Sequence, residues 1–182
     1  MADNNVTRIN RELKYSGAIV DVYSDTMQFS NGNTEVWDFV SHRKGAAAVV
    51  AVLPNGRILM VRQYRNAIGR HMLEIPAGSR DSVTEDTRIC AARELEEETG
   101  YRAGKLELLI SLFTTVAFCD EFIDVYLATD LVKTKQSLDE NEFVEICDYS
   151  LDELITMILN CEINDSKTVS AIMSYKASVE NK

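Results

Sequence analysis

Three glutamates near the middle of the chain are spaced so that they could bind a metal ion. On a helix, Glu94, Glu97 and Glu98 lie on one face, within an arc of roughly 100°. Helix stability does not favour this arrangement, because like charges at this spacing repel and because carboxylates near a helix C-terminus oppose the helix dipole. A divalent cation such as Mg²⁺ binds carboxylate oxygens and would reverse this balance. The spacing is compatible with a metal site, but an acidic run alone more commonly forms a helix face in solvent, so the choice depends on the surrounding residues.

Arginines are concentrated in the stretch immediately before these glutamates. Between residues 57 and 80 the chain has a single acid, Glu74, and five arginines: Arg57, Arg62, Arg65, Arg70 and Arg80. Planar guanidinium groups match the oxygens of a phosphate better than the ammonium group of lysine does. We therefore expect this segment to bind an anionic, phosphate-containing ligand. The alternative is that the arginines only balance an acidic surface.

Composition and charge limit the class of protein. The 182 residues are 46% hydrophobic, which is enough for one core and a small additional subdomain. A formal net charge of −10 argues against a nucleic-acid partner, because binding to backbone phosphates needs a basic face. The sequence has no apolar run as long as a membrane span and no signal peptide at its start, so we expect a cytoplasmic protein without a membrane partner. The four cysteines and two histidines lack the spacing of a zinc site or a disulfide framework.

Apolar runs and turn residues predict several strands. Two antiparallel strands at 46–53 and 58–63 are joined by a turn at 54–56, and a short extended piece follows at 73–75. Two further strands are expected at 106–113 and 122–128.

Helix signals predict three helices between and after these strands. The first runs from Glu85 to Thr99, ends at Gly100 and buries Ile89, Ala92 and Leu95. The second begins at a capping box at 150–153 and ends near Leu159. The third is capped by Asp165 or Ser166 and ends near Ala177.

Residues 13–44 form a separate pattern. Apolar pairs on either side of a turn at 31–33 predict a small antiparallel sheet that precedes the main core. A sheet of this size is only marginally stable alone and needs a partner surface. That surface is either the core or a second subunit.

The residues around the glutamates resemble a known motif. Gly78, Glu85 and the run Arg93–Tyr101, which reads RELEEETGY, are similar to the Nudix box, G-x5-E-x7-R-E-U-x-E-E-x-G-U, where U is apolar or aromatic. Six residues separate Gly78 from Glu85, whereas the pattern has five. The extra residue falls in the loop before the helix, where changes in length are tolerated best.

Other segments resemble the ADP-ribose pyrophosphatase branch of the Nudix family. They are Arg62–Arg65, Leu73–Gly78, Cys119–Glu121 with the strand that follows, and the tail motif Ile163–Thr168. At 116–117 the chain has Val-Ala, where that branch commonly has Pro-Gly.

This resemblance implies a fold and a domain organisation. The fold is an α/β class Nudix-type α/β/α sandwich with a mixed sheet, plus a small N-terminal antiparallel sheet. Residues 1–44 would then form the N-terminal sheet and make a homodimer, and residues 45–182 would form the hydrolase domain.

The resemblance also implies roles for individual residues. Glu94 and Glu98 would be the main metal ligands, Glu97 a further ligand, and the carbonyl oxygen of Ala77 would complete the set. Glu121 matches an additional metal ligand or base, so that Glu97, Glu98 and Glu121 are the expected catalytic carboxylates. Glu85 and Arg93 would support the loop and the helix.

Substrate contacts are expected from the arginines and from one aromatic residue. Arg62, Arg65 and Arg80 would bind the phosphates. Trp37, the only tryptophan, has a position similar to that of adenine-stacking aromatics in the branch, although packing in a core or an interface is an equal alternative.

The implied activity is hydrolysis of a pyrophosphate bond with Mg²⁺, or alternatively Mn²⁺, as cofactor. The first expected substrate is the nucleotide sugar ADP-ribose, which would give AMP and ribose 5-phosphate. One alternative is the same reaction on another nucleotide sugar or a dinucleotide, which Val116 and Ala117 favour. A more distant alternative is a non-catalytic nucleotide sensor; such a protein typically lacks box glutamates, which are all present here.

Overall fold

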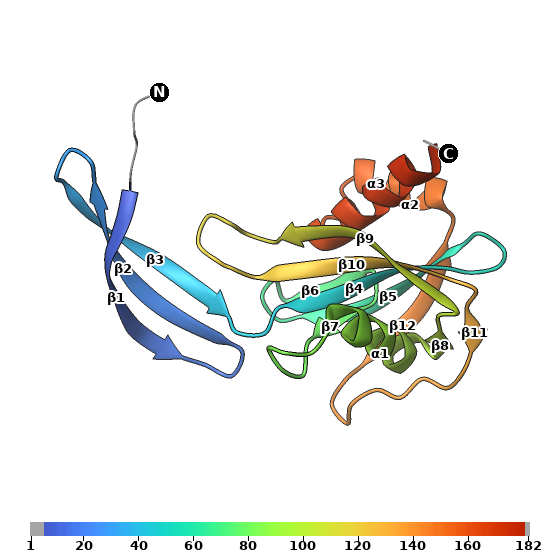
Figure 1. The fold of residues 1–182 in the computed structure, drawn as a ribbon. Coiled ribbons are helices and arrows are strands. Elements are labelled where there is room, and N and C mark those ends of the chain that lie inside the picture. The colour runs from blue at the N-terminus through green and yellow to red at the C-terminus, as the bar shows by residue number, and fades with distance from the viewer. Residues whose placement is uncertain (1–5, 181–182) are drawn as a thin grey trace. The chain divides into compact units, whose positions relative to one another are not determined.

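The computed structural model describes residues 6–180. The chain is divided into two units, one made of Met1–Gly45 with Phe113–Phe122 and the other of Ala46–Leu112 with Ile123–Lys182 (Figure 1). Unit 1 therefore includes Phe113–Phe122, a segment that the sequence assigned to the domain at 45–182. No helix within 6–180 is both long and apolar enough to cross a membrane.

Unit 1 is built on an antiparallel meander of three strands, β1 (Val6–Ser16), β2 (Val20–Phe29) and β3 (Thr34–His42). The expected turn at 31–33 joins β2 to β3, with Gly32 at a positive φ of 86° that favours glycine. The sheet begins at Val6, earlier than the expected residue 13. Residues 113–122 are attached to β3 by hydrogen bonds between the backbones of Val40 and Phe118 and of Asp120 and Val40.

Unit 2 contains a mixed sheet in the order β12-β5-β4-β10-β9. The strands are β4 (Ala46–Val52), β5 (Ile58–Arg65), β9 (Lys105–Phe113), β10 (Phe122–Thr129) and β12 (Val144–Tyr149). The central strand β4 is parallel to β10 and antiparallel to β5. Two short strands extend the sheet: β6 (Arg70–Glu74) pairs with β5, and β7 (Ala77–Ser79) pairs with β4.

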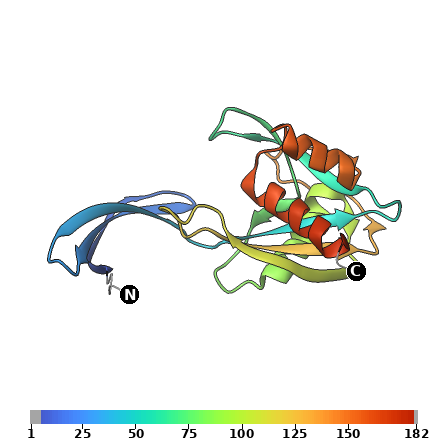
Figure 2. The same ribbon diagram turned by 90° about the horizontal axis from the view of Figure 1, so that it is seen from above.

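Helices cover both faces of this sheet, with α1 (Thr87–Thr99) on one face and α2 (Leu151–Leu159) and α3 (Ser166–Glu180) on the other (Figure 2). The alternation of side chains along β4 accounts for the two layers. Ala46, Ala48 and Val50 pack in the core under α2 and α3. Ala47, Val49 and Ala51 pack with Cys90, Ala91 and Leu95 of α1. This α/β/α sandwich, together with the small antiparallel sheet, confirms the predicted fold class.

The first helix differs in detail from the prediction. It begins at Thr87 because Asp86 is its N-cap, so that Glu85 lies in the preceding loop. Ile89 and Ala92 are exposed, and the prediction that the helix buries them is wrong. The buried arc instead includes Cys90, Leu95 and Glu98, since the acidic side of the helix also packs toward β4 and β7.

The helix ends were predicted more accurately than the short strands. Gly100 ends α1 with a φ of 67°, the capping box at Ser150 and Glu153 begins α2, and Asp165 caps α3, which extends to Glu180. The prediction missed β7, β12 and the two-stranded ladder of β8 (Tyr101–Arg102) and β11 (Val132–Lys133). These strands are short or lack a strong apolar alternation.

Candidate active site

The close contact between Gly78 and Glu94 joins the helix to the sheet. Gly78 is the middle residue of β7, and α1 packs against this strand. A Cβ atom at position 78 would overlap all three atoms of the Glu94 carboxylate group. Only glycine therefore allows this carboxylate to lie directly against the backbone of β7.

Glu98 lies one helical turn further on and is almost fully buried. Its side chain is 2% exposed, and Oε2 accepts a hydrogen bond of 3.0 Å from the backbone N–H of Ala77. The pKa of Glu98 is raised to about 8, chiefly by burial; the hydrogen bond from Ala77 opposes this shift, and the charges of Glu94 and Glu142 add to it. Burial also raises the pKa of Glu94, although Arg93 opposes this shift. For both carboxylates, the nearby positive charge is therefore too small to offset the cost of burying a negative charge.

Arg93 supplies the positive charge nearest to the helix face. One guanidinium nitrogen donates to Glu94 Oε1 at 2.7 Å and to Glu97 Oε2 at 3.1 Å. The other donates to the carbonyl oxygen of Ser79 and lies 3.5 Å from Glu85. Glu85 in turn accepts from the backbone N–H of Asp81. This agrees with the expectation that Glu85 and Arg93 support the loop and the helix.

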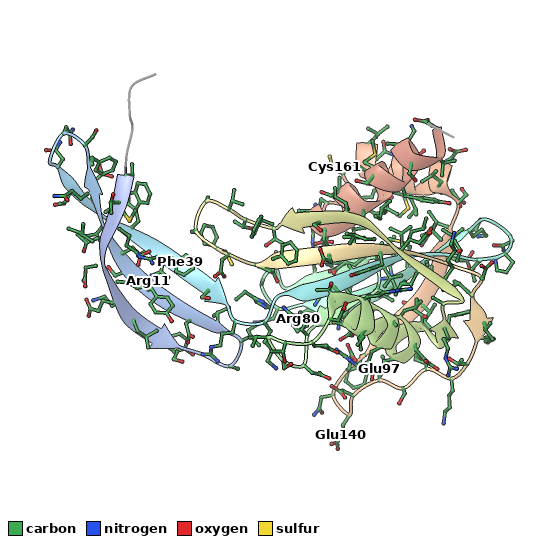
Figure 3. All side chains as sticks on the ribbon, viewed as in Figure 1. Arg11, Phe39, Arg80, Glu97, Glu140 and Cys161 are labelled. Carbon is green, nitrogen blue, oxygen red and sulfur yellow. The ribbon has the colours of Figure 1, made fainter. Side chains whose placement is uncertain are left out.

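A cavity of about 330 Å³ opens in front of these groups, entirely within unit 2. Its lining includes Ala77 and Gly78 from β7, Glu94 and Glu97 from α1, and Arg65 from β5. Figure 3 shows Glu97 projecting from the exposed side of α1. Two of the predicted carboxylates, Glu94 and Glu97, therefore share one cavity with a predicted arginine, whereas Glu98 does not line it.

The donor set of the cavity suits a hard divalent cation. It offers carboxylate oxygens whose negative charge is only partly balanced, and the backbone cradle at Gly78 holds one of them in place. Within 6–180, however, no three His, Cys, Asp or Glu side chains already converge as metal ligands. On α1, the three glutamates are bound to other groups: Glu94 and Glu97 accept hydrogen bonds from Arg93, and Glu98 accepts one from the backbone of Ala77.

The three predicted phosphate-binding arginines have different surroundings. Arg65 lines the cavity and forms a two-pronged ion pair with Glu74, at 2.8 and 2.7 Å. Arg62 lies 3.8 Å from Glu145 and is not part of this cavity's lining. Arg80 donates to the carbonyl oxygens of Glu85 and Val83 in the loop before α1 and does not line the cavity either (Figure 3).

Glu121 and Trp37, two other predicted site residues, belong to unit 1. Glu121 accepts a hydrogen bond from Thr114 at 2.6 Å and lies 3.7 Å from His42. Trp37 is 46% exposed, so it is not a core residue. It lines an aromatic cavity of about 380 Å³ within this unit, together with Phe39, Phe113 and Phe118.

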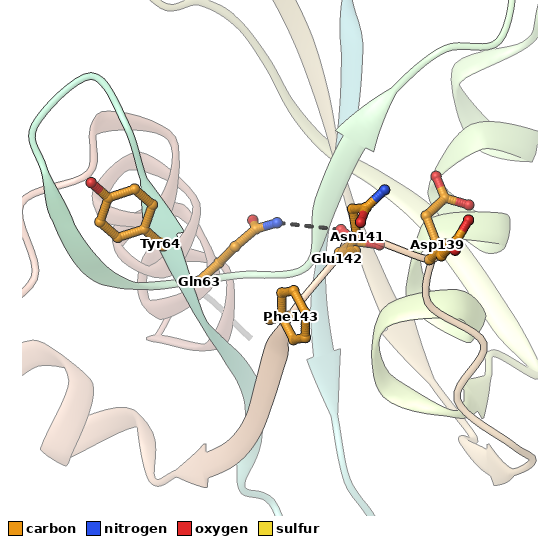
Figure 4. Close-up of a pocket in the computed structure, with 7 residues that line it drawn as sticks. Gln63, Tyr64, Asp139, Asn141, Glu142 and Phe143 are labelled. Atoms are coloured by element: carbon orange, nitrogen blue, oxygen red, sulfur yellow. Dashed lines mark hydrogen bonds between the residues drawn. The ribbon is translucent and has the colours of Figure 1, made fainter.

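Sequence reasoning missed the loop before β12. Asp139 and Glu142 line the cavity from this loop, and Gln63 of β5 donates to Glu142 at 3.3 Å (Figure 4). The same three residues border a neighbouring cavity of about 550 Å³ that also contains Tyr64 and Phe143. The signal for this loop in the sequence was a short acidic run at 139–142, just before the strand β12 that the sequence did not predict.

Comparisons with known proteins agree with this site. The NUDIX domain family model matches residues 42–171. An ADP-ribose pyrophosphatase of Bacillus subtilis is 39% identical over 166 residues, covering 90% of this chain and 89% of the relative. A methanol dehydrogenase activator of Bacillus methanolicus is 42% identical over 166 residues, which again cover 90% of this chain and 89% of the relative. An ADP-ribose pyrophosphatase of Mycobacterium tuberculosis is 35% identical over 179 residues, or 97% of this chain and 86% of the relative.

A solved structure supports the fold. The crystal structure of an ADP compounds hydrolase matches with a TM-score of 0.87 and 22% identity, covering 97% of this chain and 95% of the other. Nudix hydrolases generally use a divalent metal ion, which agrees with the donor set of the cavity. The family model, the relatives and the complete box between Gly78 and Tyr101 lead to one conclusion: the chain belongs to the NUDIX family and is a Nudix hydrolase.

Proposed function

We propose that this Nudix hydrolase cleaves the pyrophosphate bond of a nucleoside diphosphate sugar, with ADP-ribose as the first candidate and AMP and ribose 5-phosphate as products. The observation that carries this proposal is the cavity in which Glu94, Glu97 and Arg65 line the same space. Carboxylates for a cation beside a guanidinium for a phosphate suit a pyrophosphate better than a neutral substrate. The two relatives named ADP-ribose pyrophosphatase support the choice of ADP-ribose.

The proposed cofactor is Mg²⁺, with Mn²⁺ as an alternative. Glu94, Glu97, Glu98 and the carbonyl oxygen of Ala77 would hold it. A bound divalent cation neutralises phosphate oxygens and lowers the pKa of water. Arg93, which now balances Glu94 and Glu97, would then keep its contacts with Ser79 and Glu85.

The chain's own residues would bind the phosphates and accept the proton of the attacking water. Arg65 has five N–H donors, of which the pair with Glu74 uses two, so donors remain for a phosphate. Hydrolysis also needs a carboxylate within reach of the water. Glu97 is paired with the cation Arg93 and Glu98 is buried, whereas Glu142 lines the cavity and accepts from the neutral amide of Gln63, so we propose Glu142 for this role. The alternative base Glu121 stays a prediction.

A substrate panel tests this function. Purified protein is assayed with ADP-ribose, other nucleotide sugars and dinucleotides, with Mg²⁺, with Mn²⁺ and in excess EDTA, and ³¹P NMR identifies the products. We expect AMP and ribose 5-phosphate from ADP-ribose and no turnover in EDTA. Activity on another nucleotide sugar would support the same reaction with a different specificity, whereas nucleotide binding without turnover would favour the sensor alternative.

Variants of three acids separate the candidate bases. Glu142→Gln should lower kcat by about 100-fold or more if it is the base, since general base catalysis contributes roughly 10²- to 10⁴-fold. Glu121→Gln tests the alternative, and Glu140→Gln, at an acid of the same run outside the cavity lining, is the matched control. A large loss in Glu121→Gln with little effect in Glu142→Gln would reverse the assignment.

A second candidate function is the activation of a partner enzyme. It is favoured by the 42% identity to a methanol dehydrogenase activator, which spans as much of the chain as the match to the Bacillus subtilis pyrophosphatase. The test is to add the protein to methanol dehydrogenase of Bacillus methanolicus and to measure the oxidation rate. A rate increase that is lost in Glu98→Gln would show that activation depends on the hydrolytic site.

A further inference from the structure

The tail motif Ile163–Thr168 has no role in the site described so far, yet it is connected to Arg65. Lys167, in the first turn of α3, donates to the carboxylate of Glu74, which is also the partner of Arg65. Glu74 is the last residue of β6 and only 2% exposed. One buried carboxylate is therefore shared by two cations that come from positions about one hundred residues apart in the chain.

The network continues from Lys167 to the backbone that precedes the box loop. Asp165 accepts from Lys167 at 2.9 Å and from the backbone N–H and hydroxyl of Thr168 at 3.0 and 2.6 Å. Ile75, next to Glu74, donates its N–H to the Thr168 hydroxyl oxygen at 3.1 Å. The start of α3 thus holds Glu74 at the end of β6 and the next residue, Ile75, which lies two residues before Ala77.

The charges of this network bear on how strongly Arg65 can attract a phosphate. Two cations, Arg65 and Lys167, face two anions, Glu74 and Asp165. Burial alone would raise the pKa of Glu74, but the two cations lower it overall, so the carboxylate stays ionised. Without the ammonium group of Lys167, the full negative charge of Glu74 would act on Arg65 alone.

We infer that Lys167 is a positioning residue for the proposed reaction: through Glu74 it fixes the orientation of Arg65 and preserves its positive charge at the wall of the cavity. The inference rests on the proposed function in one respect, namely that Arg65 binds a phosphate of the substrate. Lys167 itself does not line the cavity, and its side chain is 12% exposed. Its effect should therefore appear in the binding of anions and less in the chemical step.

The first test compares Lys167→Met with Lys176→Met. Both change a lysine of α3 to an uncharged side chain of similar length, but Lys176 pairs with Glu180 in the last turns of the helix, away from Glu74. Lys167→Met should raise the KM for the hydrolysed nucleotide sugar about 5- to 20-fold with kcat within about 2-fold, whereas Lys176→Met should have wild-type values. An unchanged KM in Lys167→Met, or the same rise in both variants, overturns the inference.

Asp165→Asn removes a negative charge from the same network, so unlike Lys167→Met it should not raise KM. The asparagine can still accept from Thr168, but the negative charge is lost, and with it some of the anionic field at Arg65. The inference predicts a KM at or below that of wild type, although both this variant and Lys167→Met should lower Tm. A KM raised in both variants would mean that the network is only structural. Asp165→Asn decides this point even if Lys167→Met fails to fold.

A double-mutant cycle and a binding measurement complete the experiment. In an Arg65→Met background, Lys167→Met should cause no further rise in KM, because its effect passes through Arg65; additive effects would overturn the inference. The Kd of ADP, measured by calorimetry, should rise by a similar factor in Lys167→Met. Absence of turnover in wild type would contradict the proposed function, while equal ADP affinity in wild type and Lys167→Met would contradict this inference.

Discussion

The carboxylate of Glu98 accepts a hydrogen bond from the backbone N–H of Ala77, and this bond of 3.0 Å joins the last turn of α1 to β7. It holds an acid in a place where it is 2% exposed, which explains why its pKa is raised to about 8. An ionised carboxylate at this position disfavours folding unless a cation neutralises it. The bond offsets part of this cost, whereas the burial of the acid reduces the stability of the metal-free protein.

The first prediction concerns the pH dependence of stability. An acid whose pKa rises from 4.5 in the unfolded chain to about 8 in the fold holds its proton more tightly when folded, so its contribution to stability is lost as the pH rises through this window. In EDTA, the Tm of wild type should therefore fall between pH 5 and 8 more steeply than the Tm of Glu98→Gln. Glu96→Gln, at a half-buried acid of the same helix that pairs with Arg102, should keep the slope of wild type, because the pKa of Glu96 is lowered and not raised. Parallel curves for wild type and Glu98→Gln would contradict the prediction.

Gly78→Ala should destabilise the protein and abolish activity. The new methyl group would meet the carboxylate of Glu94, so either the helix or β7 must move. Overpacking of this kind costs about 1 to 3 kcal/mol, measurable by urea unfolding. The double variant Gly78→Ala/Glu94→Ala should regain most of that stability but no activity. If Gly78→Ala alone is as stable as wild type, the close contact has no structural role.

Arg65→Ala should chiefly weaken substrate binding. Hydrogen bonds to charged groups contribute about 1.5 to 3 kcal/mol, which corresponds to a KM rise of roughly 10- to 100-fold. Arg57→Ala removes the arginine just before β5, which pairs with Asp148 and Glu153, and it should leave KM unchanged. Steady-state kinetics on the hydrolysed nucleotide sugar distinguish the two. Equal effects, or none, would leave Arg65 as a partner of Glu74 only.

A fourth prediction is a homodimer formed through the sheet of unit 1. Several apolar side chains of this sheet are exposed, among them Leu13, Tyr15 and Val36, and a three-stranded sheet needs a partner surface. Sedimentation of the full chain should show a dimer at micromolar concentration, and Leu13→Glu should weaken it, whereas Glu12→Gln at the neighbouring exposed position should not. A monomeric wild type would refute the dimer.

Trp37 allows a separate test of the same unit. If its exposed ring stacks on the base of the substrate, Trp37→Ala should lose affinity for ADP-ribose, while Trp37→Phe should keep most of it. Wild-type affinity in Trp37→Ala would refute stacking without affecting the dimer.

The sequence predicted correctly the features that depend only on residues close together in the chain. The face shared by Glu94, Glu97 and Glu98 follows from the helical period, and the helix ends follow from Gly100 and the capping box at Ser150. The apolar run of β4 predicted a buried strand, but its length alone could not show that alternate residues pack under helices on opposite faces. The sequence by itself therefore determined the three helices, the longer strands, the family motif and the type of chemistry.

Contacts between distant segments were decided only by the tertiary structure. Gln63 meets Glu142, and Glu74 meets Lys167, although 79 and 93 positions separate these pairs. The pairing of Arg65 with Glu74 and the burial of Glu98 depend on how β5, β6 and β7 are placed beside α1, and no local pattern encodes that placement. Because the pKa of a carboxyl group and the availability of a guanidinium depend on such neighbours, the residue types could be predicted from the sequence, whereas their electrostatic roles could not.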